Sequence, residues 1–214
     1  MRFKSDSAWL LLMCLVVGPV FGQSASPPSL HVAGSTTVQP IITEIAEGYL
    51  EISGVNLQIL GGGSEAGIKD LRAGTADVGM VSRSLTAAER EDLSHTTIGY
   101  DALAIIVNRE NPRERITTAE LIDIYTGRVR SWDNTPQWAR EIVLVSKQVG
   151  RGTLTVFEEY TGLVSPARGY TGAGGREPIA GDSWEAGSNL DAILWVGGIP
   201  GAIGFVSIGA ADHF

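Results

Sequence analysis

The sequence has few cysteines, few histidines and no apolar run long enough for a membrane span. Its single cysteine is Cys14, and its three histidines, His31, His95 and His213, are scattered with no spacing suited to a metal. We therefore predict no disulfide, no metal site and no other cofactor. The apolar run over residues 8–20 is shorter than the ~20 residues that a membrane-spanning helix needs, which argues against a transmembrane anchor.

The first residues are typical of a secretory signal peptide. Arg2 and Lys4 give a positive start, the apolar run follows, and small residues occur over 22–26. Cys14 also allows a lipoprotein interpretation, but the residue before it suits lipid attachment poorly. We predict a cleaved signal peptide over residues 1–25 and a periplasmic location for the rest.

Composition indicates an acidic globular protein. Hydrophobic residues make up 43% of the chain and charged residues 19%, which is ordinary for a folded domain. Without the signal peptide, 14 basic and 23 acidic residues leave a net charge of −9, which argues against a nucleic-acid partner. An anionic ligand remains compatible with this charge, because local donors and not the net charge form a buried site.

Strand and helix patterns alternate along the chain. The clearest helix has apolar residues at positions 38, 41, 42, 45, 46 and 49, a spacing that predicts an amphipathic helix packed on a sheet and capped by Thr36 or Thr37. Apolar strands are predicted over 30–33, 55–60, 76–81, 102–107, 142–146 and 202–206, and further helices over 66–73, 153–160 and 188–195. Capping boxes are predicted at Thr86 with Glu89 and at Thr117 with Glu120. The alternation predicts an α/β fold with largely parallel sheets.

Three strand-to-helix junctions combine glycine with a hydroxyl. They are Gly34-Ser35-Thr36-Thr37, Gly61-Gly62-Gly63-Ser64 and Gly150-Arg151-Gly152-Thr153, and a fourth junction is Val81-Ser82-Arg83-Ser84. Glycine lets the backbone approach a ligand, and a helix N-terminus offers unpaired N–H groups that suit a small anion. One such hydroxyl is usually only a helix cap. Four junctions that each follow a strand favour a shared anion site at the carboxyl edge of the sheets.

Longer segments around these junctions match a known protein family in the same order along the chain. They are residues 33–40, 61–68, 76–83, 124–127 with Trp132, Gly152-Thr153 with Phe157, Ser188-Asn189, and 200–206. In this order they strongly resemble the phosphate-binding proteins of bacterial ABC transporters. The resemblance implies a two-lobed periplasmic binding protein type 2 fold with the ligand cleft between the lobes. We expect lobe 1 over residues 26–107, completed by about 200–214, and lobe 2 over residues 108–199.

The resemblance also assigns the anion-binding positions. It implies that the following residues face the anion: Thr36, Thr37, Ser64, Gly152 and Thr153. Ser35 lies where the family has a backbone donor to the anion. Many family members carry an acidic residue at the position of Ser82, where it accepts the proton of a protonated phosphate. Here Ser82 is followed by Arg83, and we expect both to line the site.

The cationic position departs from the family pattern as well. The arginine expected four residues before Arg151 is Lys147, and the serine expected at position 151 is an arginine. Because a guanidinium forms two parallel bonds to an oxyanion, we expect Arg151 to carry the positive charge of the site, with Lys147 as a further candidate.

These features predict a binding protein and not an enzyme. We expect it to act as a monomer that delivers phosphate, or a similar tetrahedral oxyanion, to an ABC permease in the inner membrane. The alternatives are a secreted hydrolase that uses Ser64, and a sensor or adhesion module on the same fold. Family members usually continue with a further helix after Val206-Ser207, so we interpret the chain as either a short or a truncated form.

Overall fold

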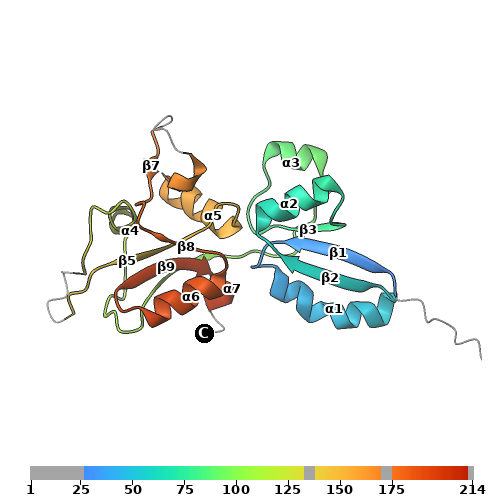
Figure 1. The fold of residues 1–214 in the computed structure, drawn as a ribbon, viewed down its shortest axis with the longest axis horizontal. Coiled ribbons are helices and arrows are strands. Elements are labelled where there is room, and N and C mark those ends of the chain that lie inside the picture. The colour runs from blue at the N-terminus through green and yellow to red at the C-terminus, as the bar shows by residue number, and fades with distance from the viewer. Residues whose placement is uncertain (1–26, 133–137, 170–174, 212–214) are drawn as a thin grey trace, which may run out of the picture.

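The computed structural model describes residues 27–132, 138–169 and 175–211. The predicted signal peptide lies outside these residues. Two lobes lie side by side, and the segment over residues 93–102 joins the last helix of the first lobe to the first strand of the second (Figure 1).

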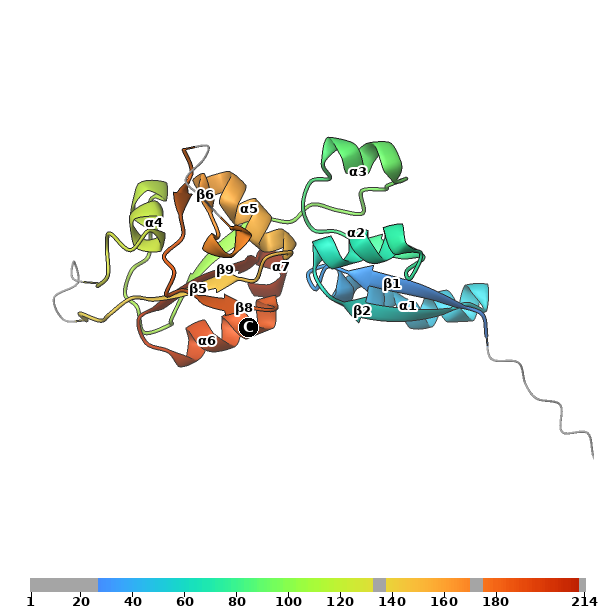
Figure 2. The ribbon, with the colours of Figure 1, turned by 45° about the horizontal axis from the view of Figure 1, so that its top comes forward.

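Lobe 1 is a small parallel sheet with helices on both faces (Figure 2). Its elements are β1 (Ser29–Gly34), α1 (Gln39–Ser53), β2 (Asn56–Gly61), α2 (Ser64–Ala73), β3 (Val78–Met80) and α3 (Ala87–Asp92). The strand order is β2-β1-β3, so the strand that comes first in the chain lies in the centre.

Glycine permits the tight packing at the carboxyl end of β1. Gly34 has a φ of +135°, and a Cβ there would lie 2.2 Å from the carbonyl oxygen of Met80 on β3. A Cβ on Gly67 of α2 would lie 2.6 Å from the carbonyl oxygen of Ala33. Both positions exclude a side chain, so the start of α2 lies directly against the end of β1.

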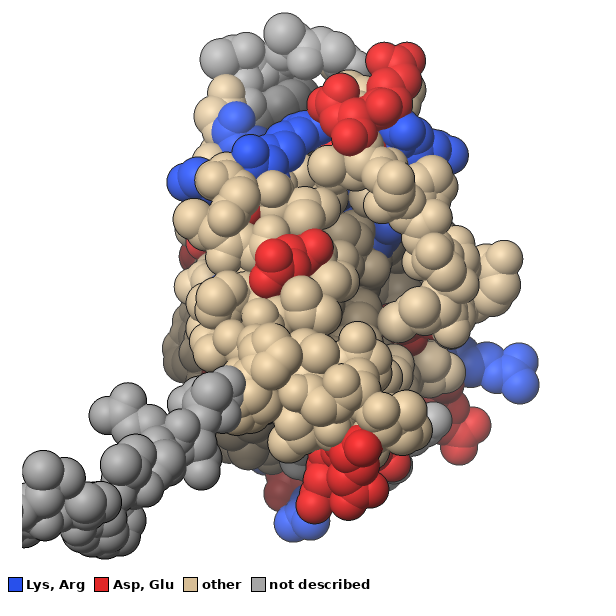
Figure 3. Space-filling model, turned by 90° about the vertical axis from the view of Figure 1, so that its right-hand side faces the viewer, with Lys and Arg blue, Asp and Glu red and all other residues tan. Residues whose placement is uncertain are grey.

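Helix α1 forms where the apolar pattern predicts it, but its surroundings differ from the prediction. Its N-cap is Val38 and no side chain makes a capping hydrogen bond, so neither predicted threonine caps it. Ile41, Ile45 and Ile52 are 54%, 53% and 90% exposed. No residue of α1 is buried. Figure 3 shows few charged side chains over much of the lobe 1 end of the molecule.

Lobe 2 is built on a mixed sheet. Its elements are β4 (Leu103–Val107), α4 (Thr118–Tyr125), β5 (Val143–Lys147), α5 (Gly152–Thr161), β6 (Leu163–Val164), a short 3-10 helix (Pro166–Arg168), β7 (Glu177–Pro178), β8 (Trp184–Ala186), α6 (Asn189–Gly198), β9 (Ala202–Ser207) and α7 (Ile208–Ala211). The main sheet has the order β4-β9-β5-β8, in which β4 and β9 are antiparallel and the other neighbours are parallel.

The lobe boundary differs from the one expected. We expected residues up to 107 to belong to lobe 1 and residues from about 200 to return to it. Instead β4 pairs with β9, and β9 pairs with β5, so both strands belong to the sheet of lobe 2. The apolar sequence of β9 suits any buried strand position, and its place between β4 and β5 fixes it in lobe 2, where helices cover both faces of the sheet.

Two hydrophobic clusters hold lobe 2 together, one on each face of its sheet. On one face Tyr125, Phe157 and Phe205 are fully buried, and the rings of Phe157 and Phe205 stack 4.0 Å apart. On the other face, α6 packs Ala192 and Val196 against the sheet.

The two predicted capping boxes are confirmed at the starts of α3 and α4. Among the described helices, none has the length and apolar character to cross a membrane.

The aromatic stack predicts a large stability loss on truncation. Phe157→Ala should lower the free energy of unfolding by about 3–5 kcal/mol, because it removes a buried ring and leaves a cavity. Urea unfolding measures the change. Tyr160→Ala is the matched control, because Tyr160 lies on the same helix and is 58% exposed, and it should change stability by far less. Equal losses in the two variants would contradict this account of the core.

Candidate functional site

Four helices begin where the two lobes meet. Lobe 1 contributes the N-termini of α1 and α2, and lobe 2 contributes those of α5 and α6. The backbone N–H of Glu65, at the start of α2, donates to the carbonyl oxygen of Gly150 just before α5 (3.1 Å). Asn189, the first residue of α6, donates from Nδ2 to Oγ1 of Thr37 (3.1 Å). Figures 1 and 2 both show the start of α5 facing the start of α2. Each helix start carries partial positive charge, so this junction attracts anions.

Three serine hydroxyls form a cluster at this junction. Ser35 donates from Oγ to Oγ of Ser82 at 2.8 Å, and the hydroxyls of Ser64 and Ser82 are 3.4 Å apart. The backbone N–H of Ser82 donates to Oγ of Ser64 at 3.1 Å. Ser35 and Ser64 are 2% and 0% exposed. The structure therefore brings together three predicted residues from three separate strand ends.

Gly152 of lobe 2 lies directly over this cluster. A Cβ at this position would lie 2.5 Å from Oγ of Ser82 and 2.6 Å from Oγ of Ser64. Only glycine allows so close an approach, so the N-terminus of α5 is placed against the hydroxyls of the opposite lobe.

The threonines contribute unequally. Thr37 donates its backbone N–H to Oγ of Ser35 at 3.1 Å and accepts the side-chain bond from Asn189, so it belongs to the network. Thr36 and Thr153 are half-buried at the same junctions. Asn189 appears in the sequence only as part of the family match, and its contact with Thr37 spans 152 positions, which no local pattern indicates.

Arg83 has a partner of its own. Its Nη1 and Nη2 each donate to one carboxylate oxygen of Glu89 at 2.8 Å, and both side chains are largely buried. The hydrogen bonds from Arg83 lower the pKa of Glu89 to about 2, although burial alone would raise it. Glu89 also closes the capping box of α3, so this pair anchors the loop after Ser82 and directs the guanidinium to a carboxylate.

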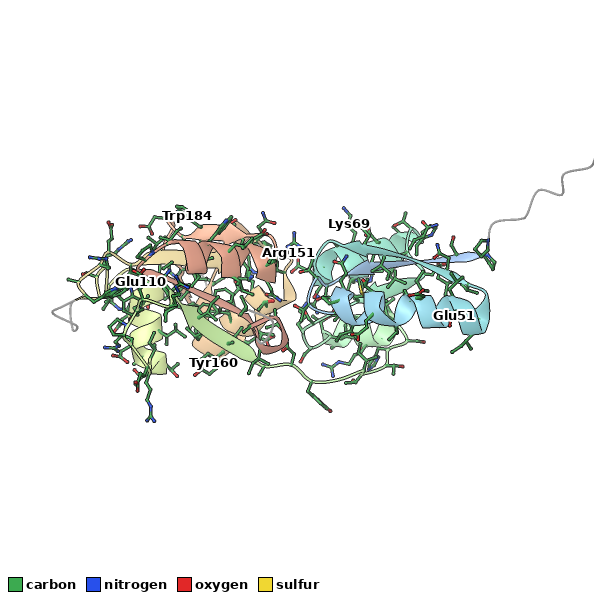
Figure 4. The ribbon with its side chains drawn as sticks, turned by 90° about the horizontal axis from the view of Figure 1, so that it is seen from below. Glu51, Lys69, Glu110, Arg151, Tyr160 and Trp184 are labelled. Atoms are coloured by element: carbon green, nitrogen blue, oxygen red, sulfur yellow. The ribbon has the colours of Figure 1, made fainter. Side chains whose placement is uncertain are left out.

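Two other cations lie on lobe 2 near the junction. Arg151 lies at the edge of lobe 2 that faces lobe 1 (Figure 4) and donates from Nη2 to the side-chain oxygen of Gln148 at 3.2 Å. Lys147 is 1% exposed and donates from Nζ to the carbonyl oxygen of Ser188. Burial lowers the pKa of Lys147 to about 7, with the positive charge of Arg151 acting in the same direction and Asp191 opposing it.

A carboxylate and an arginine also meet across the junction. Arg168 donates from Nε to Oε2 of Glu158 at 3.0 Å within lobe 2, and its Nη1 lies 3.4 Å from Oε1 of Glu65 in lobe 1.

Two hollows, of about 480 Å³ beside β1 and β2 and about 160 Å³ beside α4, lie away from the serine cluster. Within the described ranges, His, Cys, Asp and Glu form no group of three that could hold a metal.

Comparisons with known proteins identify the family to which the chain belongs. A family model described as a PBP superfamily domain matches residues 22–213. A phosphate-binding protein named PstS 2 from Streptococcus pneumoniae is 41% identical over 105 residues, which are 49% of this chain and 36% of that protein. The chain therefore spans about a third of the length of this curated relative.

Two solved structures share the fold over most of the chain. One is described as a phosphate ABC transporter substrate-binding protein from Clostridium perfringens with bound phosphate. It has a TM-score of 0.73 and 30% identity over 84% of this chain and 70% of its own. The other is an ABC-type phosphate transport receptor from Vibrio cholerae, with a TM-score of 0.62 and 32% identity over 85% and 72%. The expected two-lobed α/β binding fold is confirmed, and the chain belongs to the PBP superfamily.

Proposed function

We propose that the chain binds phosphate, or a similar tetrahedral oxyanion, between its two lobes and passes it to an ABC permease. The observation that carries the proposal is the meeting of four helix N-termini around the hydroxyls of Ser35, Ser64 and Ser82. The similar proteins from Streptococcus, Clostridium and Vibrio are described as phosphate binding or phosphate transport proteins.

The chemistry of the junction suits a small, strongly hydrated anion. A buried anion has to exchange its bonds to water for bonds to the protein, and backbone N–H groups and hydroxyls supply many donors in little space. Donors come from both lobes, so an anion between them favours the closed arrangement over an open one. The segment over residues 93–102 connects the lobes and would act as the hinge.

The proposal includes a location and an assembly state. A signal peptide over residues 1–25 would export the protein to the periplasm, where a monomer would meet the permease at the inner membrane. The hydrolase alternative has less support, because Oγ of Ser64 is hydrogen-bonded to the hydroxyl and the backbone N–H of Ser82 and not to a basic side chain.

Titration calorimetry of the purified chain with phosphate, sulfate and molybdate tests the proposal directly. We expect phosphate binding, and we expect Gly152→Ala to weaken it by more than tenfold, because the added Cβ would collide with Ser64 and Ser82. Gly197→Ala is the matched control, because a Cβ there meets no atom within 4 Å, and it should bind as the original chain does. Absence of heat with all three anions would refute the proposal.

The position of the positive charge gives a second prediction. Arg151→Ala should weaken phosphate binding by more than tenfold, because its guanidinium lies at the edge facing lobe 1 while that of Arg83 is held by Glu89. Arg140→Ala, which removes an exposed arginine elsewhere on lobe 2, controls for net charge. An unchanged affinity in Arg151→Ala would assign the ionic role to Lys147 or Arg83.

Lys147 predicts a pH dependence. A nearby bound anion favours the charged form of the amine, so binding should raise its pKa above about 7 and take up protons. Affinity should therefore be full below pH 7 and fall as the pH rises through the pKa of the bound state. The measurement is the phosphate affinity of the original chain divided by that of the Lys147→Met variant. We expect this ratio to fall by on the order of tenfold between pH 6 and 9. The ratio removes the titration of phosphate itself, and a flat ratio would place Lys147 outside the site.

A further inference from the structure

Asn189 lies at the point where α6 meets lobe 1. It is the first residue of the helix, it is 7% exposed, and Nδ2 donates to Oγ1 of Thr37 across the lobe junction at 3.1 Å. The cap of the same helix is separate, because Oγ of Ser188 accepts the backbone N–H of Asp191. The amide of Asn189 is therefore not needed to cap α6.

The other end of this amide is an unusual buried acceptor. Oδ1 of Asn189 is buried and has no hydrogen-bond partner among the described residues. A buried polar atom without a partner destabilises the folded protein by about 1–3 kcal/mol, so such atoms are rare unless they have a role. Oδ1 belongs to the same amide group whose Nδ2 bonds the Thr37 hydroxyl, and the backbone N–H of Thr37 donates to Oγ of Ser35.

The contact with Thr37 decides which end of the amide is free. A hydroxyl has one hydrogen, so Thr37 can donate to an anion only if it accepts from Asn189. The partner of Thr37 must then be the NH₂ group, as the structure has it, and Oδ1 is the end of the amide left without a partner. A Thr37 hydroxyl that donates to the anion therefore leaves Oδ1 of Asn189 as the unpartnered acceptor of the amide.

Two carboxylates on lobe 1 that could otherwise accept a proton have partners of their own. Glu65 faces Arg168 across the junction, and Oδ2 of Asp77 accepts the backbone N–H of His31 at 2.8 Å. Ser82 carries no acidic group and takes part in the hydroxyl cluster. An amide oxygen is a neutral acceptor, so it leaves the positive potential of the four helix starts intact.

We propose that Oδ1 of Asn189 accepts the hydrogen of a protonated oxyanion and thereby makes the site prefer phosphate to sulfate. This inference rests on the proposed function. At neutral pH phosphate keeps at least one O–H donor, whereas sulfate has none, so the same oxygen binds phosphate and repels the lone pairs of sulfate. Selectivity then comes from an amide of lobe 2 and not from a carboxylate of lobe 1.

Competition between inorganic phosphate and sulfate on the full chain tests the inference. Calorimetric affinities for both anions would be measured in the original chain, Asn189→Leu, Asn189→Asp and Ser188→Ala. Asn189→Leu removes the acceptor and should lower the ratio of phosphate to sulfate affinity by about tenfold, the equivalent of one lost hydrogen bond to a buried group. Asn189→Asp keeps the shape and adds a negative charge, so it should raise that ratio by weakening sulfate. Ser188→Ala removes the helix cap alone and should change both affinities by the same factor.

The readout is the ratio, because both anions share any loss that comes from breaking the contact with Thr37. A ratio unchanged in both Asn189 variants, with phosphate still bound by the original chain, would overturn the inference and leave the proposed function standing. Binding of neither anion by the original chain would overturn both. If Asn189→Leu does not fold, the ratio in Asn189→Asp decides the question.

Discussion

The close approach of Gly152 to the hydroxyls of Ser64 and Ser82 is the contact on which the arrangement of the site depends. This contact places the start of α5 against the start of α2, and position 152 requires a residue without a Cβ. The backbone bond from Glu65 to Gly150 and the side-chain bond from Asn189 to Thr37 also join the two lobes. A site assembled in this way is made largely of neutral donors held by helix ends, which preorganises it at little conformational cost.

The charged groups near the site have distinct tasks. Arg83 and Glu89 neutralise each other and anchor the loop that presents Ser82, while Glu65 and Arg168 face each other across the junction. Lys147 is buried against a carbonyl oxygen with a lowered pKa, so its charge depends on what lies beside it. In the proposed site, discrimination between similar anions would therefore rest on hydrogen-bond direction, because two anions of equal charge feel the same field but offer different hydrogens.

Local patterns predicted the elements well. The capping boxes at Thr86 and Thr117 and the apolar strands were all visible in sequence, because each depends on neighbours within a few positions. The membership of the last strand in lobe 2 was not visible. An apolar strand suits any buried sheet position, and only its pairing with β4 and β5 shows which sheet it completes.

The sequence by itself determined the α/β class, the order of the elements and the junctions that carry hydroxyls and glycine. Composition, periodicity and turn chemistry act over short distances, and the order of the motifs identified the family. Only the tertiary structure decided the partners: Arg83 with Glu89, Lys147 with Ser188, and Asn189 with Thr37. The last two pairs join residues 41 and 152 positions apart, so their contact depends on how sheets and lobes pack and not on any local preference of the chain.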